Sequence, residues 1–202
     1  MLYAYQLLDF GDVMGQAKTI NLKELKRVLD LISACDRHAE RNRTMLLFTH
    51  LCGMRIGEVC ALKISDVLDE HDKVRSELRL APKQTKGSRG RTVFVPKKML
   101  KELVAYVTTI DIEDRNAPLF RSQKGAAFSS NSATQLFQRL YERAGLIGAT
   151  SHSGRRTFIT SLAQKGVGVR VLASLAGHRN ISITQRYIDV NDDMMRDAVD
   201  LI

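Results

Sequence analysis

A basic pair in the last third of the chain has the residue types needed to hold a phosphate group. His152 and Arg155 stand three positions apart at the start of a predicted helix, so we expect their side chains on the same side of it. Free backbone N–H groups and the positive end of the helix dipole favour an anion at such a place. The spacing is also typical of a solvated basic helix start, and that alternative stays open.

A second candidate group lies in residues 169–188. Gly177 and His178 form a predicted turn between two helices, and Tyr187 follows nine residues after the histidine. A tyrosine can attack a phosphodiester, although a lone tyrosine at a helix end is more often a packed aromatic. The helix, turn and second helix could equally bind DNA without catalysis.

Two charged features earlier in the chain could join these groups. Arg55 and Glu58 stand three apart within an apolar stretch, where they could simply form a structural ion pair. Lys86 lies in a polar, glycine-containing segment, where a solvent-exposed lysine is the ordinary interpretation. Taken singly, neither feature indicates chemistry.

The elements that must position these residues are predicted to be mostly helical. Strand-like alternation is confined to residues 74–96, where two short strands flank a basic polar stretch and indicate an antiparallel β-hairpin with a basic tip. The fold class is therefore mainly α with one small antiparallel sheet. The predicted strands are 77–80 and 92–95; the predicted helices are one capped by Asn21, then 41–52, a stretch around 58–67, one after Pro96, 130–144, 153–165, 169–176, 181–188 and 192–202.

Two of these helices have a predicted buried face. Asn21 and Glu24 have the spacing of a capping box at the start of the first one. Apolar residues at helical spacing then define the buried positions. These are Leu22, Leu25, Val28, Leu29 and Ile32 in the first helix, and Leu100, Leu103, Val104 and Val107 in the helix after Pro96.

Composition indicates one folded domain with a positively charged surface. The 202 residues include 31 Lys+Arg against 22 Asp+Glu, a net charge of +9, and 44% are hydrophobic. This hydrophobic fraction is normal for a globular protein and excludes a disordered chain. The charge favours nucleic acid as a partner, with a membrane surface or plain solubility as the alternatives.

The cysteines and the chain start indicate a cytoplasmic protein. Cys35, Cys52 and Cys60 are an odd set without CxxC spacing, so neither a disulfide framework nor a zinc cluster is supported, and all three are predicted to be reduced core residues. No apolar run reaches the roughly 18–20 residues that span a bilayer, and the first residues lack the features of a signal peptide.

Read together, these positions resemble the phage-integrase family of tyrosine recombinases. The resemblance covers about residues 20–202, the family's catalytic domain, and it implies that domain's fold. It implies a site-specific recombinase or integrase that acts on double-stranded DNA without metal, ATP or another cofactor. The matching positions, in chain order, are Arg55 with Glu58, Lys86, His152 with Arg155, Gly177 with His178, and Tyr187.

The resemblance also implies a role for each matching residue. Tyr187 would attack the scissile phosphodiester and form a 3′-phosphotyrosine bond. Arg55 and Arg155 would bind the non-bridging oxygens. Lys86 would protonate the departing 5′-oxygen, and His152 would assist proton transfer or hold the phosphate.

The remaining candidates have supporting roles. His178 would hydrogen-bond the same phosphate, and Glu58 would orient its neighbours rather than act as a catalyst. Basic residues on the hairpin and beside the two later motifs are expected to contact the DNA backbone. These are Lys83, Arg89, Arg91, Arg156 and Arg179.

Two features depart from the family pattern. Many members have HxLRH where this chain has Gly154 and Arg156 in place of the apolar residue and the second histidine. Residues 1–18 are expected to be an N-terminal extension to a catalytic domain over 19–202, with no room for the separate core-binding domain that usually accompanies it. The alternatives are a noncatalytic DNA-binding regulator or an inactive remnant that uses residues 169–188; a type IB topoisomerase shares the constellation but fits the spacing and size less well.

The last residues form a predicted acidic amphipathic helix. Residues 188–202 contain five aspartates against Arg196 alone, with Met195 and Val199 on an apolar face. Such a helix could pack on its own domain, or, as the family implies, dock on a neighbouring subunit of a homotetramer on DNA. The expected setting is a bacterium, phage or mobile element, with an accessory DNA-binding protein as a possible further partner.

Overall fold

The computed structural model describes residues 17–85, 89–123, 125–188 and 192–200. The predicted fold class is confirmed, because the chain is mainly helical with one two-stranded antiparallel sheet. The elements are α1 (Leu22–Cys35), α2 (Ala39–Leu51), α3 (Ile56–Cys60), α4 (Ile64–Val67), β1 (Glu77–Leu80), the short 3₁₀ helix η1 (Pro82–Gln84), β2 (Arg91–Phe94), α5 (Lys97–Val107), α6 (Ser130–Arg143), α7 (Ser153–Ala163), α8 (Val169–Ala176), α9 (Ile181–Gln185) and α10 (Asp192–Val199).

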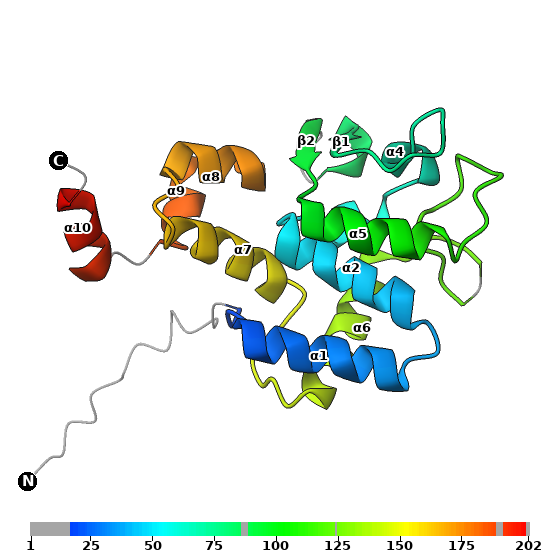
Figure 1. Ribbon diagram of the computed structural model, residues 1–202, viewed down its shortest axis with the longest axis horizontal. Helices are drawn as coiled ribbons and strands as arrows, with labels where there is room; N and C mark the ends of the chain where they lie inside the picture. Colours follow the sequence, from blue (N-terminus) through cyan, green and yellow to red (C-terminus); the bar gives the residue numbers. More distant parts are fainter. Residues whose placement is uncertain (1–16, 86–88, 124, 189–191, 201–202) are drawn as a thin grey trace, which may run out of the picture.

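Helix α2 forms the centre of the core. It packs against α1, α5 and α7, and Figure 1 shows it between α5 and α1. Residues 44–50 are buried without interruption, as expected for a helix that is covered on all sides. The sheet and α8 lie toward one end of this core, and α10 lies apart from it in the view of Figure 1.

Helix α1 begins as predicted, but its buried face is narrower than the predicted one. The Asn21 side chain accepts from the Glu24 N–H at 2.9 Å, and Glu24 accepts from the Asn21 N–H at 2.9 Å, so the capping box is confirmed. The prediction for Leu22 was wrong, since its side chain is 81% exposed. Ile20, just before the helix, takes the buried place at this end.

Helix α5 is rotated relative to the prediction. Met99, Leu103 and Tyr106 are buried, whereas Val104 is 49% exposed. Tyr106 explains the difference: its ring stacks on Phe120 at 5.2 Å and its hydroxyl donates to the Leu119 carbonyl at 2.9 Å, so the aromatic side chain takes the core face.

The sheet is the predicted antiparallel hairpin, and its connection is anchored. Glu77 pairs with Phe94 and Leu80 with Arg91. Between the strands, the Gln84 amide donates to Asp66 at 2.6 Å and to the Ala61 carbonyl at 2.9 Å. The connection is thereby held against α3 and α4 before it reaches the predicted basic tip.

The structure places the three cysteines in two different environments. Cys52 and Cys60 are buried, but Cys35 is exposed, so the prediction that Cys35 lies in the core was wrong.

Within the described ranges, no helix is long and apolar enough to cross a membrane, and no group of three or more His, Cys, Asp or Glu side chains could hold a metal ion. The domain boundary after residue 18 stays a prediction; the Lys18 N–H contacts the Gly148 carbonyl at 3.2 Å.

Close packing between α2 and α7 explains the glycine that departs from the family pattern. A Cβ at Gly154 would lie 2.2 Å from Thr49 Oγ1 and 2.8 Å from His50 Cδ2. Both neighbours are buried, so neither side chain can turn into solvent to make room. Thr49 and His50 therefore occupy the volume that a larger side chain at position 154 would need.

Gly154→Ala is expected to lower the free energy of unfolding by about 1–3 kcal/mol, since added volume in a packed core forces side chains out of place. Urea denaturation measures this loss. Gly168→Ala is the matched control, because no atom lies within 4 Å of its Cβ position, and we expect a change of less than about 0.5 kcal/mol there. Adding Thr49→Ala to Gly154→Ala should recover part of the loss, and an unchanged stability of the single variant would contradict this packing account.

Candidate functional site

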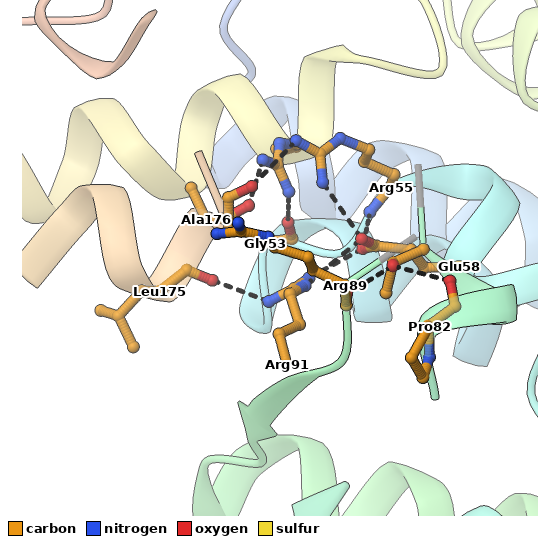
Figure 2. Close-up of polar contacts among 11 residues, drawn as sticks. Gly53, Arg55, Glu58, Pro82, Arg89, Arg91, Leu175 and Ala176 are labelled. Carbon is orange, nitrogen blue, oxygen red and sulfur yellow. Dashed lines mark hydrogen bonds and ion pairs between the residues drawn. The ribbon is translucent and has the colours of Figure 1, made fainter. Parts of the chain in front are cut away.

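Three arginine side chains meet at the C-terminal end of α8. The consecutive carbonyls of residues 175–177 each accept from a different guanidinium: the first from Arg91 Nη1 at 2.8 Å, the second from Arg155 Nη2, and the third from Arg55 Nη2 at 3.4 Å. Figure 2 shows Arg55 and Arg91 beside Leu175 and Ala176 at this helix end. The last carbonyls of a helix lack intrahelical partners and carry the negative end of its dipole, so cations are favoured there.

Glu58 supplies the negative charge that holds two of these arginines together. Its carboxylate is 1% exposed and accepts from Arg91 Nη2 at 2.7 Å and from Arg55 Nη1 at 3.1 Å. Burial alone would raise the pKa of this carboxyl, but the hydrogen bonds and charges of Arg91 and Arg55 hold it below its usual value. Glu58 is therefore ionised at neutral pH and fixes both guanidiniums.

Arg155 is the most deeply buried of the three arginines. Besides its bond to the helix end, its Nη1 donates to the Gly53 carbonyl at 2.6 Å. Burial, followed by the nearby charge of Arg55, lowers the pKa of Arg155 to about 9, so it remains charged at neutral pH. Since a guanidinium has five N–H donors, the two bonds to carbonyls position it and leave donors for an anion.

The turn after α8 brings His178 and Tyr187 together. Their rings stack with centroids 5.9 Å apart and an interplanar angle of 17°. His178 Nδ1 lies 2.8 Å from Thr184 Oγ1, within α9. Burial and the charges of Arg155 and Arg55 lower the pKa of His178 to about 4, so the imidazole is neutral at neutral pH.

Tyr187 itself lies just beyond α9 rather than inside a helix, because α9 ends at Gln185 and not at residue 188 as predicted. The Tyr187 N–H donates to the Thr184 carbonyl at 3.0 Å, and its carbonyl accepts from Thr160 Oγ1 at 3.3 Å. The Arg156 guanidinium lies 5.5 Å from the centre of its ring. Helix α7 thus holds the tyrosine from two directions.

His152 is more exposed than Arg155 at the start of α7. It is exposed at the start of the helix, and it lines an open cavity of about 600 Å³ together with Arg156 and Tyr187. Arg155, three residues later, is buried and donates to the Ala176 carbonyl at the end of α8. His152 therefore shares the surface of this cavity with Tyr187.

The basic residues expected on the DNA-facing surface fall into two groups. Lys83, Arg89 and Arg179 are exposed, and Arg156 is half-buried against Tyr187. The structure corrects the expectation for Arg91, whose side chain is only 10% exposed and is held by Glu58 and the end of α8. Lys86, the predicted general acid, lies outside the described residues.

The sequence did not predict the contacts of Arg91 with Glu58 and the end of α8, or the partner of His178. Strand alternation could have indicated the first, since Arg91 shares a face with the buried Val93 and Val95. Thr184 carries no comparable signal. The accepting groups at residues 175–177 are backbone carbonyls, which no side-chain motif could reveal.

Comparisons with a family model and with curated relatives agree with each other. The family model described as the phage integrase family matches residues 18–194. Tyrosine recombinase XerA of Thermococcus onnurineus is 30% identical over 188 residues, which cover 90% of this chain and 61% of the relative. Tyrosine recombinase XerC of Bacillus pumilus is 29% identical over 182 residues, covering 86% of this chain and 57% of the relative. The chain thus spans less than two thirds of the length of these relatives.

Solved structures share the fold. The crystal structure of XerA recombinase superposes with a TM-score of 0.70 at 25% identity, covering 90% of this chain and 63% of that one. The Tn1549 transposon integrase in complex with a circular intermediate DNA gives a TM-score of 0.73 at 20% identity, covering 95% and 68%.

Proposed function

Because the chain belongs to the phage integrase family, we propose that it is a site-specific DNA recombinase that breaks and rejoins strands through a covalent bond to Tyr187. One observation carries this proposal: His178 and Tyr187 stack at the end of the same α8–α9 unit whose carbonyls fix Arg55 and Arg155. A nucleophile, a neutral hydrogen-bonding group and two fixed guanidiniums are the parts that transfer of a phosphodiester to tyrosine requires.

The proposed step is a transesterification. The Tyr187 oxygen attacks the phosphorus, the new O–P bond forms, and the bond from phosphorus to the 5′-oxygen breaks. The phenol loses its proton and the departing 5′-oxygen gains one. The bond energy is kept in the phosphotyrosine, so a second 5′-hydroxyl can reverse the step without ATP.

Charge at the site suits this chemistry. Arg55, Arg91 and Arg155 face a single carboxylate, Glu58, so the cluster carries a net charge of +2 at neutral pH. A phosphodiester carries one negative charge, and its pentacoordinate transition state carries two. Donors fixed beforehand on backbone carbonyls favour the state with the greater charge.

His178 fits the role of a neutral donor. The Thr184 hydroxyl can donate to Nδ1 of His178. The imidazole then has its own hydrogen on Nε2, and this N–H can donate a hydrogen bond to a phosphate oxygen. His152 and Lys86 keep the roles that the family resemblance implies, assistance in proton transfer and protonation of the 5′-oxygen.

Covalent trapping tests the proposal. The purified chain is incubated with nicked duplexes taken from the DNA on either side of its gene, so that the cleaved end diffuses away and the intermediate persists. We expect an SDS-stable protein–DNA adduct, and mass spectrometry of its peptides should place the nucleotide on Tyr187. If no adduct forms on any duplex that the chain binds, the alternative of a noncatalytic DNA-binding regulator or an inactive remnant is correct.

Exposed residues of the connection between β1 and β2 are proposed to contact the DNA backbone. Lys83→Gln with Arg89→Gln should weaken binding on all sequences and reduce the slope of log K against log salt by about 1.8, since each phosphate contact contributes about 0.9. Fluorescence anisotropy at several salt concentrations measures the slope. The matched control is Lys23→Gln with Arg27→Gln on α1, which removes the same charge from the far end of the molecule (Figure 1); equal slopes in both double variants would contradict the assignment.

The C-terminal helix is proposed to dock on a neighbouring copy in a tetramer on DNA. Met195 and Val199 of α10 are 52% and 67% exposed, so an apolar surface is available on this acidic helix. We further propose that the protein acts in the cytoplasm, either in a bacterium or as the product of a mobile element. An accessory DNA-binding protein is the proposed further partner.

A further inference from the structure

Arg91 connects three parts of the chain. It begins β2, yet its guanidinium reaches Glu58 in α3 with both Nη2 (2.7 Å) and Nε (3.3 Å). Its remaining nitrogen, Nη1, donates to the Leu175 carbonyl at 2.8 Å. Figure 2 shows Arg91 between these two partners. A single planar fork therefore links the sheet, the Arg55–Glu58 pair and the end of α8.

The Arg91 side chain packs on Gly177, so its aliphatic part lies directly beside the turn that leads to His178. A Cβ built on Gly177 would lie 2.7 Å from Arg91 Cδ and 3.2 Å from Nε. The φ of Gly177 is +62°, a backbone conformation that favours glycine. The turn thus has the one residue that allows both its own conformation and the close approach of Arg91.

Removal of Arg91 would leave its partners incompletely bonded. Glu58 would keep only the bonds from Arg55, and the Leu175 carbonyl would lose the bond from Arg91 at a helix end that is otherwise covered by arginines. Unpaired buried polar groups are costly, so the segment is expected to shift toward other partners. Any shift of residues 175–178 moves the carbonyls that position Arg55 and Arg155.

We propose that Arg91 is a positioning residue for DNA cleavage, which acts by holding Glu58 and the end of α8 so that Arg55, Arg155 and His178 keep their places. This inference rests on the proposed recombinase function. It assigns Arg91 to the interior of the site rather than to the DNA backbone.

The first test separates cleavage from binding. Arg91→Gln and Arg91→Lys are compared with Arg79→Gln, which removes an exposed arginine from the same sheet. At saturating protein, the single-turnover cleavage rate of Arg91→Gln should fall roughly 10- to 100-fold, as is typical when a group that orients reacting residues is lost. DNA affinity should stay within about threefold of the Arg79→Gln value, and Arg91→Lys, which keeps the charge and one contact, should recover part of the rate.

The second test needs neither DNA nor activity. The Gly177 and His178 amides donate to the carbonyls of Ser174 and Ala173 at 3.0 and 2.9 Å, so their hydrogen exchange reports on this turn. Arg91→Gln should speed exchange at these two amides at least about tenfold, whereas Arg79→Gln should leave it unchanged. Unchanged exchange in Arg91→Gln would overturn the inference.

The outcomes are distinguishable. The positioning role would be overturned if Arg91→Gln cleaved at the same rate as Arg79→Gln at saturating protein. It would also be overturned if Arg91→Gln lost only DNA affinity. Failure of the wild-type chain to form an adduct would overturn the proposed function, and the exchange measurement would still decide whether Arg91 holds the turn.

Discussion

Replacement of Tyr187 by phenylalanine is expected to abolish the SDS-stable adduct completely and to leave DNA binding within about twofold. The variant lacks the oxygen that would bond to phosphorus, and no other atom of the ring can form that bond. The ring itself remains, so its stacking on His178 and its contact with Arg156 persist. Adduct on a denaturing gel and affinity by anisotropy are measured on the same DNA.

A matched tyrosine supplies the control. The hydroxyl of Tyr106 donates to the Leu119 carbonyl in the core, away from the proposed site. Tyr106→Phe should lower stability by about 1 kcal/mol, the usual net value of one such hydrogen bond, and still form the adduct. An adduct that persists in Tyr187→Phe would identify another nucleophile and refute the assignment.

Arg155→Lys is expected to lower the cleavage rate at saturating protein by about 100- to 1,000-fold, the usual cost of one preorganised donor. The guanidinium spans the carbonyls of Gly53 and Ala176 while it presents its other donors, and an ammonium group cannot reproduce that fork. The positive charge is kept, so DNA affinity should change by no more than about threefold. Single-turnover kinetics and binding isotherms separate the two quantities.

Arg75→Lys is a suitable control for this substitution, because Arg75 also donates to a backbone carbonyl, that of Leu68, at 3.1 Å. It should cleave at the wild-type rate. If Arg155→Lys matches it, the guanidinium geometry has no role in the reaction, and Arg155 only anchors α8 to the Gly53 turn.

Local rules explain why much of the fold was predictable. The Asn21–Glu24 capping box, the two strands and most helix starts depend on residues a few positions apart, and the structure has them within one or two residues. Predictions that required knowledge of a distant partner were less accurate. The buried face of α5 depends on Phe120, which the helix period alone cannot indicate.

The sequence by itself determined which residue types are available for phosphate chemistry and the order in which they occur, because both properties depend only on position along the chain. Only the tertiary structure decided what each one touches. Arg91 and Leu175 are 84 positions apart, and Arg55 and Gly177 are 122 apart, so these contacts arise only when β2 and the start of α3 pack against the end of α8. Burial of Arg91 against Glu58, rather than exposure on a basic hairpin, follows from this long-range packing, and the charge of the side chain alone carries no information about it.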